Sequence, residues 1–384
     1  MDPFIIHDWE AATITYTGPN GYEWVLSGPG MGEQGVELAL KPKGMYGAPV
    51  KTIWRSGANQ DGGTYEGQRH PARDIQWAIH LFGVDGYDLE DIYGRWSRAW
   101  STSKTGTIRY TTPSGVTRTI AVQLVEMINT EPDRDPRLTG YVKLALDIRA
   151  PRPWYQSEPA RDAWRFDGIN FVGHVTVSNP TDRPTALRWS LKSPARFILP
   201  DYSWVEGDEH EHRMVRMPFQ KLGQDVAIDT QEGEPTAVCP GYPNYWALLG
   251  GQDFLYTVPP GTPPTTIPIY VDPLPTIPFN LPIEWSMWLA EKVTEQINQL
   301  PDTTVFTTTP EQMAEWIADA VREVTPDWLE DLSPDIIGEM IPSTIAGWIT
   351  QAFGSLGNMA GAAAMVEMPR EWDGPWGLSE EAYW

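Results

Sequence analysis

Residues 225–271 read DVAIDTQEGEPTAVCPGYPNYWALLGGQDFLYTVPPGTPPTTIPIYV, and this stretch decides the fold of the chain. Short runs of alternating apolar residues are separated by glycine, proline and aspartate, a pattern typical of strands joined by tight turns. The last strand is set off by the turn Pro259-Pro260-Gly261. The order of strand, turn, apolar stretch and two further strands predicts a β-rich domain.

The composition is that of a globular protein with unusually many large aromatic side chains. A length of 384 residues is enough for two or three domains. The 19 Trp and 15 Tyr suit extensive interfaces as well as cores, because flat rings give much contact area for little entropy. The single cysteine, Cys239, excludes an internal disulfide and a cysteine-rich zinc site. No secretory signal is visible at the N-terminus, so we expect synthesis in a cytoplasm.

Negative charge is concentrated at the C-terminal end. The formal net charge is −23, and residues 273–384 hold 18 acidic and three basic residues, or −15. Such acidity argues against binding nucleic acid through its phosphates. It suits the lining of a conduit from which DNA is repelled.

The first 150 residues predict one β-rich domain with a single helix. The turns Pro19-Asn20-Gly21 and Pro113-Ser114-Gly115 each join two alternating runs as a hairpin. Apolar residues at helical spacing predict the helix over Leu89–Trp100. The strands are predicted at Ala12–Thr17, Tyr22–Ser27, Val36–Lys41, Val50–Ser56, Asp74–Phe82, Thr107–Thr112, Val116–Ile128 and Gly140–Ile148.

The remainder divides into a linker, a second β-rich domain and a helical extension. Arg149–Pro159 is proline-rich and reads as a linker, and residues 160–272 form the second domain. Residues 273–384 open with a stiff proline-rich segment and continue as short, acidic amphipathic helices. One starts at the capping box Thr309-Pro310-Glu311-Gln312. An earlier apolar stripe consists of Trp285, Trp288, Leu289, Val293 and Ile297.

Several motifs have weak chemical interpretations. Gly30–Gly35 has the letters of a dinucleotide fingerprint, but a strand pattern follows it where the fingerprint requires a helix. Asp208–His212 offers two histidines at i and i+2 without an evident third metal ligand. Cys239 has no suggested base nearby. A glycosidase needs two carboxylates placed across a cleft, and the sequence does not show which of the 51 acidic residues face one another.

We therefore predict no enzyme: no catalytic residue, no bound cofactor and no metal ion.

The stretch Met340–Val366 has no charged residue, which raises the question of a membrane span. Polar residues and glycines keep this stretch too weakly hydrophobic for a membrane span, and packing against other proteins is the better interpretation.

Two stretches resemble a family of phage proteins. VELALKPKGMYGAPVKTIWRSGANQDGGTYEGQRHPARDIQWAIHLFG, residues 36–83, resembles the belt domain of siphophage distal tail proteins, most closely the minor tail proteins of phages that infect actinobacteria. Phe171–Lys192 together with Asp225–Val271 resembles the galectin-like β-sandwich of that family. The resemblance thus implies a mainly β fold, with a belt domain and a galectin-like sandwich before the helical extension.

The resemblance implies a structural protein at the tail tip of a virion. Six copies would form a ring that joins the tail tube protein to the tail-tip hub, and genomic DNA would pass through its lumen. The second domains would hold receptor-binding or other minor tail proteins. Residues expected at interfaces are Trp54, Tyr65, Arg69, Arg73, Trp77, Trp285, Trp288 and Trp316.

Two questions stay open at this point. Residues 273–384 lie outside the family pattern, and form either a docking arm for tip proteins or a pad over their own second domain. The galectin-like shape also allows an alternative function, the binding of host cell-wall glycan. Its candidate contacts are Trp189, Trp204, Tyr242 and Trp246.

Overall fold

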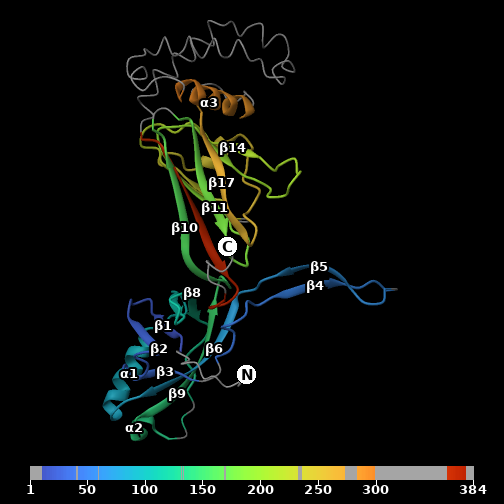
Figure 1. The fold of residues 1–384 in the computed structure, drawn as a ribbon. Coiled ribbons are helices and arrows are strands. Elements are labelled where there is room, and N and C mark those ends of the chain that lie inside the picture. The colour runs from blue at the N-terminus through green and yellow to red at the C-terminus, as the bar shows by residue number, and fades with distance from the viewer. Residues whose placement is uncertain are drawn as a thin grey trace, which may run out of the picture. The chain divides into compact units, whose positions relative to one another are not determined.

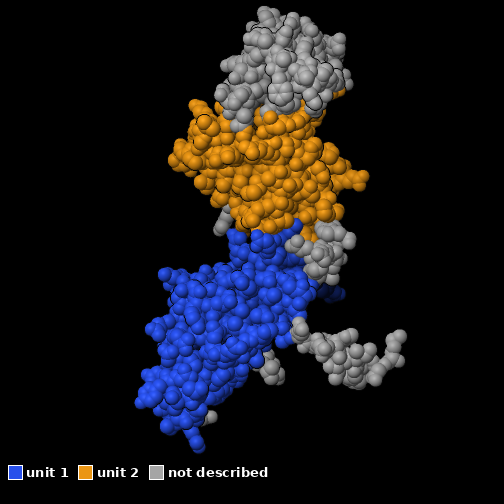
Figure 2. Space-filling model, turned by 60° about the vertical axis from the view of Figure 1, so that its left-hand side comes forward, with its two compact units in different colours: residues 1–158, 181–183, 370–384 blue, residues 159–180, 184–369 orange. Residues whose placement is uncertain are grey.

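The computed structural model describes residues 11–39, 42–58, 60–130, 132, 134–167, 170–231, 236–272, 283–298 and 361–377. The chain forms two compact units (Figure 2). Unit 1 comprises Met1–Glu158, Thr181–Arg183 and Arg370–Trp384, and unit 2 comprises Pro159–Pro180 and Pro184–Pro369. Each unit is therefore built from segments far apart in the sequence.

Unit 1 is an antiparallel β structure around one core. The strands are hydrogen-bonded in the order β2-β1-β7-β8-β9-β6-β3. Their bounds are Thr13–Thr17 (β1), Glu23–Ser27 (β2), Val36–Leu38 (β3), Arg73–Phe82 (β6), Gly106–Thr111 (β7), Thr117–Leu124 (β8) and Tyr141–Ala150 (β9). Alternate residues of β6, β8 and β9 are buried, so one face of each strand meets the shared core. The predicted hairpins β1–β2 and β7–β8 are confirmed.

A side chain occupies the outer edge of β2. The Gln34 Oε1 atom accepts a hydrogen bond from the Val25 N–H at 2.7 Å, and Gln34 Nε2 donates to the Glu23 carbonyl at 2.9 Å. A strand edge otherwise offers unpaired backbone groups to another chain. Gln34 therefore takes the place of a neighbouring strand at this edge.

The predicted helix of unit 1 is α1, Gly86–Arg98. It begins earlier than its apolar stripe because the Asp85 side chain accepts hydrogen bonds from the backbone N–H groups of Tyr87 and Asp88. Leu89, Ile92 and Trp96 are buried. Trp96 and Trp100 thus belong to the core of unit 1, whereas Tyr93 is exposed.

Unit 2 has two sheets around a second core. One has the order β11-β17-β13-β14, and the other runs β16-β15-β12-β18-β10. The strands are Tyr155–Arg165 (β10), Val172–Asn179 (β11), Arg188–Lys192 (β12), Phe197–Pro200 (β13), Met214–Arg216 (β14), Val226–Asp229 (β15), Thr236–Val238 (β16), Thr262–Val271 (β17) and Ala363–Trp372 (β18). The prediction of a mainly β fold is confirmed.

The short helices have different settings. In unit 1, α2 spans Pro136–Thr139, and in unit 2 a 3₁₀ helix spans Tyr245–Leu249. The predicted stripe after residue 283 is α3, Ile283–Asn298. Its Ser286 Oγ accepts from Arg216 Nη2 at 2.9 Å and donates to Asp272 Oδ2 at 3.2 Å, all within unit 2. In the part of the chain that the structure describes, no helix is long and apolar enough to cross a membrane.

Two segments differ from the sequence prediction. The expected linker Arg149–Pro159 is strand at both ends, because β9 continues to Ala150 and β10 starts at Tyr155, whose ring is buried. The expected helical extension ends in β18, which pairs with β12. The sequence AAMVEMPREW alternates with period 2 and buries Ala364, Val366, Met368, Arg370 and Trp372, so the strand follows from its pattern. The other predicted C-terminal helices, including Thr309–Gln312, lie outside the described residues.

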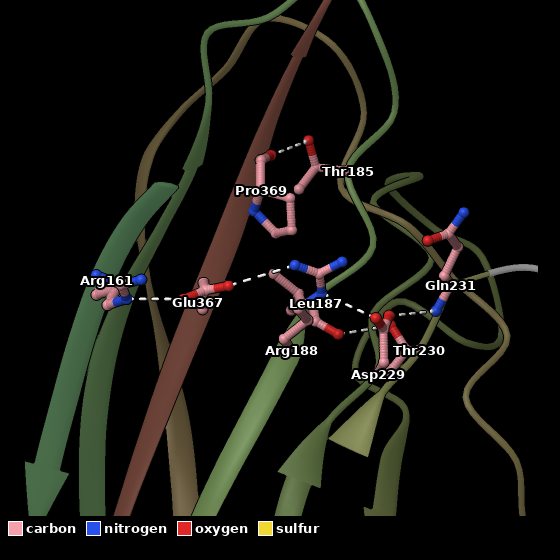
Figure 3. A network of polar contacts seen from close by, with 9 residues as sticks. All are labelled: Arg161, Thr185, Leu187, Arg188, Asp229, Thr230, Gln231, Glu367 and Pro369. Carbon is pink, nitrogen blue, oxygen red and sulfur yellow. Dashed lines mark hydrogen bonds and ion pairs between the residues drawn. The ribbon is translucent and has the colours of Figure 1, made fainter. Parts of the chain in front are cut away.

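A row of alternating charges crosses the sheet around β18 (Figure 3). Arg161 Nε of β10 lies 2.7 Å from one Glu367 oxygen of β18, and Arg188 Nη1 of β12 lies 3.4 Å from the other. Arg188 Nε in turn lies 2.9 Å from Asp229 Oδ2 of β15. The row therefore links four neighbouring strands through their charged side chains.

We expect Glu367→Ala to destabilise unit 2 by about 1–2 kcal/mol, since it leaves two arginines without their shared carboxylate. The Glu367 side chain is 19% exposed, so solvent screens the pairs only in part. Chemical denaturation of the variant measures the loss. Glu206→Ala, at an exposed loop position, is the control and should change stability by less than about 0.5 kcal/mol. An equal effect of both substitutions would contradict a role for the row.

Candidate functional site

The candidate functional surface is a hairpin that extends away from the body of unit 1 (Figure 1). Its strands, β4 (Lys51–Arg55) and β5 (Thr64–Arg69), pair only with each other among the described strands. Every residue of β4 is exposed, and so is every residue of β5 except the half-buried Gly67. We call residues 51–69 the arm. An isolated two-stranded hairpin is marginally stable in water, so the arm is suited to a partner surface.

The arm presents apolar side chains to solvent. Trp54, Tyr65 and Ile53 are 59%, 50% and 45% exposed. The rings of Trp54 and Tyr65 meet edge to face across the hairpin, with centroids 5.4 Å apart. Arg55 and Glu66 form an ion pair at 2.9 Å beside them. Exposed aromatic clusters of this kind characterise protein interfaces.

His70 holds the two legs of the arm together at its root. Its Nδ1 lies 3.0 Å from the Pro49 carbonyl, and its Nε2 lies 3.3 Å from Arg183 Nη1. A carbonyl only accepts and a guanidinium only donates, so both contacts are hydrogen bonds when the imidazole is neutral with its proton on Nδ1. The ring of Trp154 lies against His70 and 3.8 Å below the Arg183 guanidinium. The direction in which the arm leaves unit 1 is thus set by packed side chains.

The predicted interface residues fall into four groups, one of which is the buried pair Arg73 and Trp77. Trp54, Tyr65 and Arg69 gather on the arm and are exposed. Trp288 is half-buried against the core of unit 2. The Trp285 side chain and Trp316 lie outside the described residues.

Arg73 and Trp77 are corrections to the predicted interface, because both are buried in unit 1. Arg73 donates to the backbone carbonyls of Met45 and Asp373, and Trp77 Nε1 contacts Met45 Sδ at 3.2 Å. Burial lowers the pKa of Arg73, and the neighbouring Tyr155 and Asp373 oppose this shift. The alternation of β6 placed these side chains on its inner face.

The four candidate glycan contacts do not form one exposed platform. Trp189 is buried, and Trp204 and Trp246 are half-buried against the core of unit 2. Trp189 and Trp204 line a cavity of about 10 Å³, the size of one water molecule and too small for a sugar ring. Tyr242 is exposed but does not line this cavity. Burial of Trp189 in the core removes the ring face that stacking on a sugar needs.

The glycine-rich and histidine-containing motifs singled out in the sequence both lie in loops. Gly30–Gly35 is a loop of turns between β2 and β3, as expected from the strand pattern that follows it. In the Asp208–His212 loop, His210 Nδ1 lies 2.6 Å from the Tyr256 hydroxyl and His212 packs edge-on to Tyr202. Within the described residues no three metal-ligating side chains are grouped.

Comparison with known proteins identifies a relative. No family model matches this sequence. Over 301 residues the chain is 26% identical to minor tail protein Gp27 of Mycobacterium phage L5. The aligned region covers 65% of this chain and 88% of that protein. The chain is thus similar to a phage minor tail protein. The resemblance predicted from the sequence is confirmed, and the relative is a phage tail protein, in agreement with the prediction that the chain is no enzyme.

Two solved structures are similar in fold at low identity. The Dit protein (gp19.1) of phage SPP1 has a TM-score of 0.46 at 14% identity, over 68% of this chain and 98% of that one. A chain of the phage P2 baseplate in its activated conformation with Ca has a TM-score of 0.41 at 9% identity, over 68% of this chain and 97% of that one.

Proposed function

We propose that this chain is a distal tail protein, a structural adaptor whose copies form a ring at the tail tip. The ring joins the tail tube to the tail-tip hub and continues the DNA channel. Unit 1 corresponds to the belt that closes the ring, and unit 2 to the galectin-like platform for receptor-binding or other minor tail proteins. The similarity to a phage minor tail protein supports the setting in the virion.

The observation that carries this proposal is the arm. A projecting hairpin with exposed Trp54 and Tyr65 leaves apolar surface in water unless a partner covers it. A ring needs two different patches on each subunit, because each copy contacts its neighbours head to tail. The arm supplies one such patch. The acidity of the chain suits a lumen through which DNA slides without binding.

We expect the purified protein to form closed rings, and Trp54→Ser with Tyr65→Ser to dissociate them. Central aromatic residues each contribute about 2 kcal/mol or more to an interface, so the pair should weaken association about a thousandfold. Mass photometry gives the copy number, and negative-stain images show whether the particles have a central hole. The matched control is Tyr87→Ser on α1, an exposed aromatic outside the arm.

If the double variant forms rings at the same protein concentration as the unmodified chain, the arm is not part of the interface between copies. A chain that stays monomeric at high concentration, and is absent from virions, would refute the ring adaptor itself.

A further inference from the structure

Unit 1 has an open groove with no charged lining residue. It has a volume of about 710 Å³ and lies where β1 begins, β2 ends and the β7–β8 hairpin turns. The lining side chains are short or apolar, among them Thr13, Pro29, Met31, Thr111 and Pro113. Met31 is 47% exposed at this groove. Such a surface binds apolar groups without having to desolvate charge.

The groove has a fixed backbone shape on one side. Gly28 lines it with a φ of +86°, a conformation that favours glycine. A Cβ atom added there would lie 2.8 Å from Thr13 Oγ1 and 2.9 Å from Thr13 Cα. Any other residue would therefore push the β2 end away from β1 and change the groove.

We propose that this groove receives Trp54 and Tyr65 from the arm of a second copy of this chain. The inference rests on the proposed ring and names the second patch that the ring requires. The groove has room for both aromatic side chains, and the arm offers Trp54 and Tyr65, which the described residues of its own chain leave about half exposed. The contact is heterologous, so each copy both gives an arm and receives one.

Charge also favours a second copy as the occupant. The arm carries three basic and two acidic residues, a net charge of +1, in a chain of −23. The remainder of each copy is therefore at −24, and the arm, with the opposite sign, is the segment whose approach to another acidic copy is least opposed by charge repulsion.

Addition of the arm to the β2 edge is disfavoured. The amide of Gln34 already occupies the backbone groups of Glu23 and Val25 there. Side-chain insertion into the adjacent groove needs no free backbone group on β2. The groove is therefore the better receiver in this part of unit 1.

The test adds a charge to the groove with Met31→Lys and compares it with Met127→Lys. Met127 is 87% exposed and does not line the groove. We expect Met31→Lys to raise the concentration for half-maximal ring formation at least about tenfold, because a lysine there is desolvated and repels the basic arm. Met127→Lys should change it less than about twofold.

A mixing experiment shows that both variants are folded and that the two patches are complementary. The Trp54→Ser/Tyr65→Ser variant keeps its groove, and Met31→Lys keeps its arm. We expect each alone to stay monomeric and an equal mixture to form heterodimers but no larger species, since only one arm–groove contact is possible. Mass photometry of the mixture at the concentration where the unmodified chain forms rings gives the result.

The outcomes separate the two proposals. Rings that tolerate Met31→Lys, or a mixture that forms no heterodimer, overturn the groove assignment while rings of the unmodified chain keep the proposed function. Residues 1–10 lead into Ala11 at the groove and are the competing occupant. A chain without them should still form rings, and loss of rings on their removal would also overturn the assignment. Absence of rings in the unmodified chain would refute the function as well.

Discussion

We expect a chain that ends at residue 360 to fail to fold its second unit, and a chain that lacks only residues 299–360 to fold. In the second variant a flexible Gly/Ser linker of about 20 residues joins α3 to residue 361. The difference arises from β18, which only the second variant retains. Its residues 363–367 pair with Lys192–Arg188 of β12, and on its other side β18 neighbours β10. Its loss would therefore leave a gap within the sheet rather than a shorter edge.

The expected effect is comparable with the stability of an ordinary domain. Ala364, Val366 and Met368 are buried in the core of unit 2, together with Ala362 just before the strand. Each large side chain contributes about 1.5–3 kcal/mol through burial, and the backbone groups of β12 and β10 would lose their partners as well. Domains are stable by only about 5–15 kcal/mol in total. Unit 2 should therefore be unfolded at room temperature in the shorter chain.

Near-UV circular dichroism and limited proteolysis measure this difference. We expect the chain ending at residue 360 to lose the aromatic signal of unit 2 and to be cleaved throughout residues 159–272. The linker variant should retain both the signal and the resistance. Equal protection of the two variants would contradict a structural role for β18.

The same pair of variants addresses the C-terminal extension. Because β18 returns to the sheet, residues 273–360 form an insertion between β17 and β18. Whether the C-terminal extension docks tip proteins or covers its own second domain is thus a question about this insertion, not about the arm of residues 51–69. In the described part, α3 packs on unit 2 through Ser286 and Ala290, as a pad would. Recruitment of tip proteins by the linker variant tests the docking role of the rest.

Arg118→Ala should destabilise unit 1 by about 3–4 kcal/mol. The Arg118 side chain is fully buried, and its Nη1 donates to the carbonyls of Gly374 and Trp376 at 2.9 Å each. Its guanidinium lies 3.8 Å from the ring centre of Trp372. Truncation would leave two carbonyls without this donor and a cavity beneath the tryptophan.

The effect should be transmitted to the chain end that Arg118 holds. Trp376 packs on Tyr46 and Tyr110, with centroids 4.8 and 6.1 Å apart. Burial, helped by the nearby Tyr46, raises the pKa of Tyr110 to about 12. Release of residues 373–377 would expose this tyrosine, so its pKa should fall toward about 10, the value of an exposed tyrosine.

Urea denaturation and ultraviolet titration of tyrosine measure the two effects. Arg109→Ala is the matched control, since Arg109 lies exposed on β7 next to β8. It should cost less than about 0.5 kcal/mol. Arg118→Lys keeps the charge but not the forked donor geometry, so its loss of stability should lie between those of Arg118→Ala and Arg109→Ala. A loss below about 1 kcal/mol for Arg118→Ala would contradict the anchoring role.

The sequence by itself determined many of the local elements and the resemblance to phage tail proteins. Alternation along residues 74–82 and 262–271, the Asn-Gly turn after Pro19 and the apolar stripe of α1 correspond to β6, β17, the β1–β2 hairpin and the helix. These features follow from side-chain period and turn chemistry, which act over a few residues. The quoted stretches also led to the phage tail family, in agreement with the Gp27 relative.

Tertiary structure alone decided which alternating segments are buried. The apolar residues Ile53 and Trp54 lie on the exposed arm, whereas Arg73 and Trp77 sit in the core. The strand Ala363–Trp372 pairs with residues 188–192, a partner that no local pattern specifies. Burial depends on contacts between segments distant in sequence, and a period of two residues fixes only that a strand has two faces. The groove also depends on tertiary structure, because the segments around residues 13, 28 and 112 come together to line it only after folding.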